Sequence, residues 1–145
     1  MKIVYSYYVL DIVHRGHLAM LENSKAIAGE GGKLIVGILT DEAVMEKKHK
    51  PILSFDERFN LARAIRYVDV VVPQETYSPL PNLMSIKPDV LMESTSHNEA
   101  DIEKVHDFMQ SINGSMIVLP YYPSQSSTDI KRIIKQRTSP PNLEP

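Results

Sequence analysis

The sequence contains no cysteine and no tryptophan, and its charge is almost balanced. Without cysteine there is no disulfide, no thiolate zinc ligand and no thiol nucleophile. Sixteen Lys and Arg residues against 18 Asp and Glu residues give a net charge of −2, which is not the basic composition of a nucleic-acid-binding protein. No apolar run approaches the roughly 20 residues that span a membrane. We expect a soluble, cytoplasmic protein with no nucleic-acid or membrane partner.

Short apolar segments rich in β-branched residues alternate with amphipathic segments. The apolar segments predict strands that are buried on both faces, at Ile3–Val9, Lys33–Leu39, Asp69–Val72, Asp89–Met92 and Ser115–Leu119. The amphipathic segments predict helices at Gly16–Ala28, Ser54–Arg66, Asn98–Ile112 and Ser127–Arg137. The alternation predicts a Rossmann-like, doubly wound α/β fold: a five-stranded parallel sheet with helices on both faces.

The chain length predicts a single domain, since 145 residues is close to the usual domain size. Three glycines within 29–32 end the first predicted helix, and Tyr77–Pro81 predicts a stiff loop. The last segment, 138–145, contains three prolines. We therefore expect one domain over 1–137 and a Pro-rich tail or linker stub over 138–145.

The loop between the first predicted strand and the first predicted helix reads Asp11-Ile-Val-His-Arg-Gly-His. In an open α/β sheet the ligand lies at the carboxyl ends of the strands. His14 and His17 flank Gly16 at a helix N-terminus, where free N–H groups favour an anion and imidazoles can donate to phosphate oxygens. Gly16 allows a phosphate to approach the backbone closely. The alternative is a zinc site, which needs a third ligand from another histidine or a carboxylate.

Basic residues follow the second predicted strand. Lys47 and Lys48 lie in the segment Glu-Lys-Lys-His-Lys, which predicts either a clamp for a triphosphate or a solvated, charged loop. Arg58 and Arg66 stand eight residues apart, about two turns, and therefore near one face of their predicted helix. Either arginine can reach a nucleotide or lie at the surface.

Hydroxyl residues follow the last predicted strand. Ser126, Ser127 and Thr128 precede the apolar residues of the final predicted helix, which is the pattern of an N-cap. The same hydroxyls, together with the N–H groups of a helix start, can also hold terminal phosphates. Capping alone would explain them without any ligand.

These motifs resemble those of the cytidylyltransferase-like nucleotidyltransferases. His14-Arg-Gly-His17 matches the H-x-G-H signature, with Asp11 three residues before the first histidine. Ser126-Ser-Thr-x-Ile-Lys131 is similar to the second signature, I-S-S-T-x-I. Segments 39–42, 54–58 and 65–69 resemble glycerol-3-phosphate cytidylyltransferases, and segments 72–74, 81–83 and 87–89 resemble the cytidylyltransferase domains attached to phosphoenolpyruvate mutases. The resemblance runs from residue 1 to about residue 137.

The resemblance implies nucleotidyl transfer. A phosphate or phosphonate oxygen of a small acceptor attacks the α-phosphorus of a nucleoside triphosphate, and pyrophosphate leaves. The transferred group is expected to be CMP. The alternatives are adenylyl transfer from ATP, as in pantetheine-phosphate, flavin or sugar-phosphate enzymes, and a nucleotide-binding sensor without catalysis. Magnesium is expected to accompany the triphosphate through phosphate oxygens and water rather than protein ligands, and a homodimer is expected.

The resemblance also assigns roles to the residues above. His14 and His17 would stabilise the α-phosphate, and Lys47 or Lys48 would neutralise the phosphates. The expected nucleotide- and phosphate-binding residues are Val9, Asp11, Gly16, Arg58, Ser126, Ser127 and Thr128.

The chain departs from the family pattern in the segments near the expected site. Tyr8 stands where the family's Gly-x-Phe-Asp segment has glycine, so its side chain must point away from the site or reshape it. The family's G-x-D-W segment, which helps to hold the base, is replaced by Met92-Glu-Ser-Thr-Ser-His97. Tyr121 stands where glycerol-phosphate enzymes have an arginine. These departures bear on which base and acceptor are bound.

Overall fold

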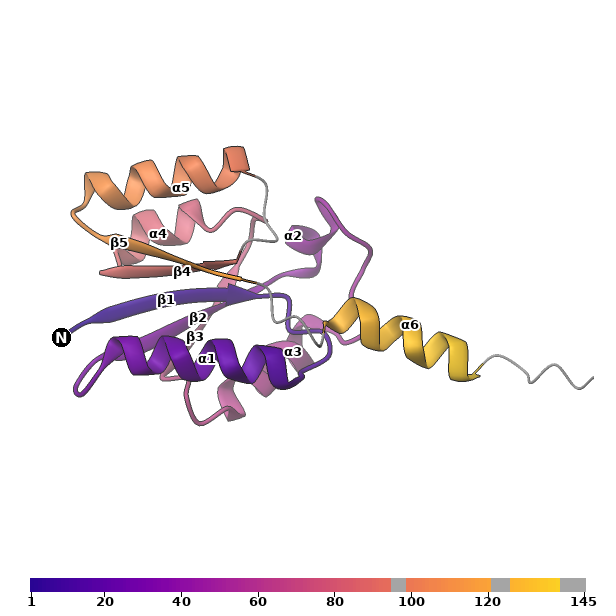
Figure 1. Ribbon diagram of the computed structural model, residues 1–145. Helices are drawn as coiled ribbons and strands as arrows, with labels where there is room; N and C mark the ends of the chain where they lie inside the picture. The colour runs from indigo at the N-terminus through magenta and orange to yellow at the C-terminus, as the bar shows by residue number, and fades with distance from the viewer. Residues whose placement is uncertain (95–98, 121–125, 139–145) are drawn as a thin grey trace, which may run out of the picture.

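A five-stranded, all-parallel sheet forms the centre of the protein in the computed structural model, which describes residues 1–94, 99–120 and 126–138 (Figure 1). Its strands are β1 (Ile3–Tyr8), β2 (Lys33–Leu39), β3 (Val70–Gln74), β4 (Val90–Ser94) and β5 (Ser115–Leu119). They lie in the order β3-β2-β1-β4-β5. The Rossmann-like α/β fold is confirmed.

Helices cover both faces of the sheet. In Figure 1, α1 (Arg15–Ala28) and α3 (Phe55–Ala64) lie against one face, and α4 (Leu80–Ile86) and α5 (Glu99–Ser111) lie against the other. Two further helices, α2 (Asp41–Met45) and α6 (Ser127–Thr138), lie beyond the carboxyl ends of the strands. The chain runs outward from β1 to β3, then crosses to β4 on the other side of β1, so the strand order reverses beside β1.

The core has two layers because neighbouring side chains on β1 face opposite sides of the sheet. Val4 packs with Leu21 of α1 in one layer. Tyr5 packs with Leu83 of α4 and Met109 of α5 in the other. Each of these side chains is buried, so both helical layers are fixed to the sheet by apolar contact.

A buried polar network joins α4 to the sheet. The hydroxyl of Tyr5 donates to Gln74 Oε1 at 2.6 Å. Asn82 Nδ2 donates to Tyr5 Oη at 2.9 Å and to the carbonyl of Pro73 at 3.0 Å. Because each polar group has a partner, burying them does not carry the cost of unsatisfied donors.

The short helices α2 and α4 depart from the sequence prediction, which placed a stiff loop over Tyr77–Pro81 and no helix between β2 and the predicted helix at Ser54–Arg66. The two helices have five and seven residues, which is too short for an amphipathic period to show. A local cap and tertiary packing define them instead: Thr40 Oγ1 accepts from the N–H of Ala43 at the start of α2, and Leu83 of α4 is buried.

Several expectations fall outside the described residues. These are Tyr121, positions 95–97 of the segment that replaces G-x-D-W, and 139–145 of the predicted tail, whereas Thr138 is the last residue of α6. Within the described ranges, no helix combines the length and the apolar character needed to cross a membrane.

Candidate active site

A cleft of about 870 Å³ opens at the carboxyl ends of the strands, where the strand order reverses. An open α/β sheet binds its ligand at this place, and the volume suits a ligand of nucleotide size. The wall of the cleft comes from the ends of β1, β2, β4 and β5 and from α1 and α6. Most predicted site residues line it, namely Val9, Asp11, His14, Gly16, His17, Lys47, Lys48, Ser127 and Thr128.

His14 and His17 form the start of α1 with their own side chains. His14 is the N-cap residue, and its Nδ1 accepts from the N–H of Gly16 at 3.0 Å. His17 Nδ1 accepts in return from the N–H of His14 at 3.2 Å, which completes a capping box. The two rings are in contact at a tilt, with 3.9 Å between their centroids and an interplanar angle of 33°. The N–H of Gly16 is thus partly used by the cap, which sequence analysis did not foresee.

This arrangement sets the protonation of both imidazoles. A ring nitrogen that accepts a hydrogen bond carries no proton, so each neutral ring carries its proton on Nε2. Burial, and then the neighbouring His14, lower the pKa of His17 to about 4, and burial also lowers the pKa of His14. At neutral pH both rings are therefore uncharged donors at Nε2.

The two lysines of the cleft differ in their surroundings. Lys47 Nζ pairs with Asp101 Oδ2 at 2.9 Å and lies 5.3 Å from the centroid of the Tyr77 ring. Lys48 has no carboxylate partner among the described residues, and burial, followed by the charge of Lys131, lowers its pKa. Lys48 is therefore the lysine whose charge is left for an anion in the cleft.

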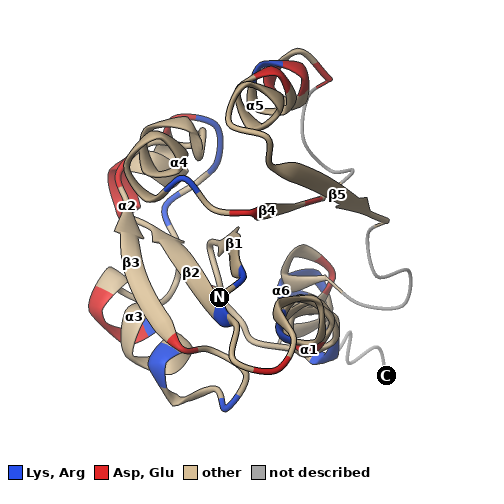
Figure 2. Ribbon diagram, turned by 90° about the vertical axis from the view of Figure 1, so that its left-hand side faces the viewer, with Lys and Arg blue, Asp and Glu red and all other residues tan. Residues whose placement is uncertain are grey.

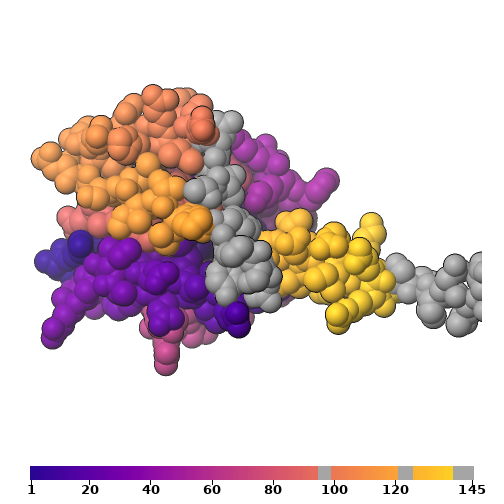
Figure 3. Space-filling view, viewed as in Figure 1, coloured from indigo at the N-terminus to yellow at the C-terminus, as the bar shows by residue number. Residues whose placement is uncertain are grey.

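Helix α6 brings a further lysine to the cleft. It projects from the body of the molecule (Figure 3), and its sequence has four basic residues and one acidic residue. Figure 2 marks basic segments in blue and an acidic segment in red on its ribbon. Lys131 lines the cleft and pairs with Asp11. Sequence analysis did not include Lys131 in the site, although a helix that starts at Ser127 places Lys131 one turn later on the same face.

The hydroxyl residues at the start of α6 have separate roles. Ser126 does not line the cleft: it is 8% exposed, and its Oγ accepts from the N–H of Asp129 as an N-cap. Ser127 Oγ donates to the carbonyl of Ile12 at 2.9 Å and so ties α6 to the loop after β1. Thr128 lines the cleft, and its hydroxyl has no hydrogen-bond partner within the described part of the chain. The geometry of Ser126 therefore favours a role as helix cap over contact with a phosphate.

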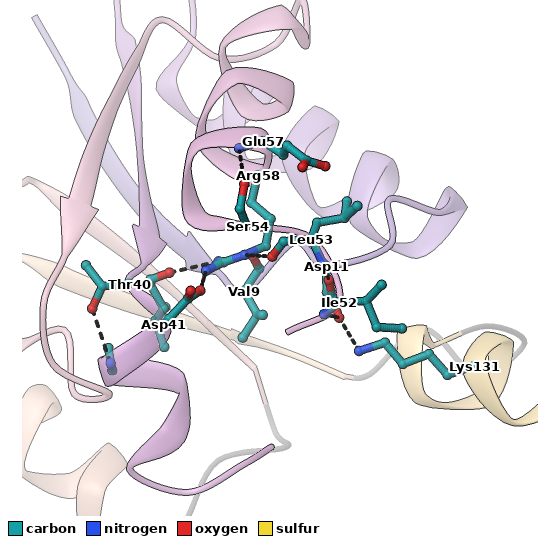
Figure 4. Close-up of polar contacts among 12 residues, drawn as sticks. Val9, Asp11, Thr40, Asp41, Ile52, Leu53, Ser54, Glu57, Arg58 and Lys131 are labelled. Carbon is teal, nitrogen blue, oxygen red and sulfur yellow. Dashed lines mark hydrogen bonds and ion pairs between the residues drawn. The ribbon is translucent and has the colours of Figure 1, made fainter. Parts of the chain in front are cut away.

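Asp11 lines the cleft, but its carboxylate is engaged by the protein (Figure 4). It is 2% exposed and accepts from the N–H groups of Ile52 and Leu53 at 3.0 and 2.8 Å, and from Lys131. Burial alone would raise the pKa of Asp11, but the bonds from Leu53, Lys131 and Ile52 outweigh it and lower the pKa. Asp11 therefore fixes the loop that carries Lys48 and the start of α6.

The expectation that Arg58 contacts substrate or nucleotide is wrong. Its side chain is 0% exposed and does not line the cleft. Nη1 donates to the carbonyls of Val9 and Leu39, both at 2.8 Å, and Nη2 pairs with Asp41 at 2.7 Å (Figure 4). A guanidinium has five N–H donors, and here they hold together the ends of β1 and β2 and the start of α2. Arg66 is exposed and contacts the neighbouring Tyr67.

Among the described residues, those that line the cleft do not form a set of ligands for a metal ion. Asp11 is the one acidic residue among its lining residues in the described ranges, and its oxygens are occupied as above. Nowhere in the described part of the chain do three His, Asp or Glu side chains gather as metal ligands would.

Comparison with known proteins identifies the family. The family model described as cytidylyltransferase-like matches residues 9–133, which include both motifs of the cleft. This chain belongs to the cytidylyltransferase-like family. The family is one of nucleotidyltransferases, and it includes the relatives that follow.

The relatives of known name differ in length. The chain is 32% identical over 130 residues to the FAD synthase of Korarchaeum cryptofilum, with 86% of each protein covered. It is 31% identical over 138 residues to the bifunctional protein HldE of Alcanivorax borkumensis, with 94% of this chain covered. The chain spans only 28% of the length of that HldE protein.

A solved structure of low sequence identity has the same fold. The crystal structure of the lipopolysaccharide core biosynthesis protein from Thermoplasma volcanium superposes with a TM-score of 0.70 at 20% identity. The match covers 86% of this chain and 99% of that one.

Replacing Arg58 tests its structural role. We expect Arg58→Met to lower the free energy of unfolding by about 3–5 kcal/mol, because it leaves Asp41 and the carbonyls of Val9 and Leu39 without their donor. Urea denaturation measures the change. The matched control is Arg66→Met, which removes an exposed arginine and should leave the unfolding midpoint unchanged. Equal midpoints for the two variants would contradict the role given to Arg58.

The buried, neutral His17 makes stability depend on pH. Between pH 6.5 and about 4 the unfolded chain binds a proton at His17 that the folded chain does not, so stability falls as the pH is lowered. Glutamine at this position can still accept from the N–H of His14 but does not titrate. We expect the loss of unfolding free energy between pH 7 and pH 5 to be about 1–2 kcal/mol smaller in His17→Gln than in the wild type. Identical pH profiles would show that His17 is not held neutral.

Proposed function

We propose that the protein transfers a nucleoside monophosphate from a nucleoside triphosphate to a small, phosphate-bearing acceptor and releases pyrophosphate. The observation that carries this proposal is the pair of neutral imidazoles at the start of α1, whose Nδ1 atoms are used by the backbone and whose Nε2 protons are left for a ligand. A site for phosphate binding alone does not require two such donors in contact at one helix end.

The charges around the cleft suit an in-line attack on the α-phosphorus. Negative charge grows on the α-phosphate oxygens in the transition state, where His14, His17 and the start of α1 can donate hydrogen bonds. Because both rings are already neutral and fixed, they need no reorganisation as the charge grows. The proposal includes no covalent enzyme intermediate, in keeping with the lack of cysteine.

Groups of the loop after α2 and of α6 would bind the leaving pyrophosphate. Lys48 and Lys131 bring two positive charges that disfavour each other in the absence of an anion, as the lowered pKa of Lys48 indicates. Thr128 and the N-terminus of α6 add donors to the same wall. A polyphosphate that bridges the two lysines would relieve their repulsion.

We favour ATP as the donor. The FAD synthase relative covers 86% of this chain at 32% identity, and its name indicates that it makes flavin adenine dinucleotide. The transfer of CMP, expected from the resemblance, has no support from the names of the relatives above. A sensor without catalysis remains the alternative of another class, and the two fixed histidines argue against it.

Magnesium enters this proposal only with the nucleotide. Asp11 cannot serve as a ligand without giving up Ile52, Leu53 or Lys131, so phosphate oxygens and water would hold the ion. A homodimer and a cytoplasmic location stay predictions from the sequence.

Pyrophosphate release tests the reaction and the donor together. The purified protein is given magnesium and either ATP or CTP, with a panel of phosphoalcohols, sugar phosphates, phosphonates and flavin phosphates as acceptors. We expect release that depends on one acceptor and on ATP. Release with CTP alone would overturn the choice of donor and keep the reaction. Tight nucleotide binding by calorimetry without release for any acceptor would favour the sensor.

The two lysines should respond differently to replacement. We expect Lys48→Met to lower kcat/KM for the nucleotide by about two orders of magnitude, since it removes an unpaired charge from the cleft. Lys47→Met is the matched control, because Lys47 is already held by Asp101, and we expect a loss of less than about tenfold. The reverse order would show that Lys47 leaves Asp101 to bind the phosphates.

A further inference from the structure

The ring of Tyr8 lies against the imidazole of His17. Tyr8 is the last residue of β1, and His17 lies in the first turn of α1. The two ring centroids are 6.0 Å apart with an interplanar angle of 88°, which is an edge-to-face contact. Both residues also line the cleft. The sequence left two outcomes for Tyr8, a side chain that points away from the site or one that reshapes it. Tyr8 is part of the wall of the cleft, which agrees with the second outcome.

Hydrogen bonds fix the far end of this tyrosine. Ser6 Oγ donates to Tyr8 Oη at 2.5 Å, and the Tyr8 hydroxyl is also hydrogen-bonded to the side chain of Ser24. Ser24 Oγ in turn donates to the carbonyl of Met20 at 2.7 Å. Ser24 stands seven residues, about two turns, after His17 on α1, so the two lie on one face of the helix. The Tyr8 ring thus bridges from the serines to His17 between β1 and α1.

The capping bond at Nδ1 fixes His17 along one direction only. It holds the nitrogen that faces the backbone of His14 but does not keep water from the rest of the ring. Tyr8 covers the imidazole on the side of β1, and His14 contacts it at the N-cap. These two ring contacts cover parts of the imidazole that the capping bond leaves open to water.

We propose that Tyr8 is a positioning residue for His17: its ring excludes water from the imidazole and holds Nε2 toward the cleft. The claim about His17 itself is independent of the reaction, whereas the effect on turnover rests on the proposed function. The titratable groups in contact with the His17 ring are His14 on α1 and Tyr8 on β1. The other titratable residues in the wall of the same cleft are Tyr7, Asp11, Lys47, Lys48, His49, Lys50, Tyr77 and Lys131.

Removing the ring should hydrate His17. In Tyr8→Ala we expect the pKa of His17, measured by NMR titration of its ring, to rise from about 4 by at least about one unit toward its ordinary value. Tyr8→Phe keeps the ring and should leave the pKa of His17 within about 0.3 units of the wild type. The tautomer, read from the ¹⁵N shifts of the ring, should stay Nε2–H in both variants, because the N–H of His14 still donates to Nδ1.

The matched control for lost volume is Tyr5→Ala. Tyr5 is a fully buried tyrosine on the same strand that faces α4 and α5 instead of α1. It should destabilise the protein and leave the pKa of His17 unchanged. If Tyr8→Ala does not fold, Tyr8→Leu carries the test, since leucine fills part of the space and should give a smaller rise. An unchanged pKa in a folded variant without the ring, or an equal rise in Tyr5→Ala, would overturn the proposal.

Turnover gives a second readout that separates this proposal from the proposed function. We expect Tyr8→Ala to lower kcat more at pH 5 than at pH 8, with KM for the nucleotide little changed. A hydrated His17 is protonated to a greater extent at the lower pH, and a ring protonated at Nδ1 cannot accept the capping hydrogen bond from His14. An equal loss of kcat at both pH values would overturn the effect on turnover. If the pKa of His17 changes as expected but neither the wild type nor the variants show turnover, the proposed function is wrong and the role of Tyr8 in positioning His17 is still supported.

Discussion

The architecture of the cleft depends on two buried charges that the protein satisfies with its own groups. Arg58 joins the ends of β1 and β2 to α2, and Asp11 joins the end of β1 to the loop at 52–53 and to α6. A buried charge is unfavourable unless it is fully hydrogen-bonded. Moving any one of these segments away would break such bonds and leave a buried charge without its partners. The lysines of the cleft therefore stand on backbone that is fixed by electrostatics as well as by apolar packing.

The same arrangement separates framework from ligand-binding groups within a few residues of chain. Asp11 and Arg58 look like ligand-binding residues in sequence, since both are charged and lie near a strand end. The polar atoms of these two side chains are hydrogen-bonded inside the protein, whereas Lys48, Thr128 and both histidines line the cleft, and the cap does not use the Nε2 atoms of the histidines. Charge and position in the sequence place Asp11 and Arg58 near the ends of strands; only the structure shows that both charges are satisfied inside the protein.

Sequence alone predicted the five strands and the four longer helices, because apolar periodicity and buried β-branched runs are local signals. It missed α2 and α4, which are too short for a period and are defined by caps and tertiary packing. It also placed Arg58 in the site, since burial of an arginine depends on carbonyls that lie 19 and 49 residues away in the chain. Lys131 could have been predicted as a site residue, because it lies four residues, about one helical turn, after Ser127.

The capping box of α1 gives each histidine two duties at once. One nitrogen of each ring begins a helix, and the other is offered to the cleft. A replacement of His14 or His17 that cannot accept the backbone hydrogen bond therefore weakens the start of α1 as well as changing the wall of the cleft. This part of the wall can change its donors only to side chains that also cap the helix.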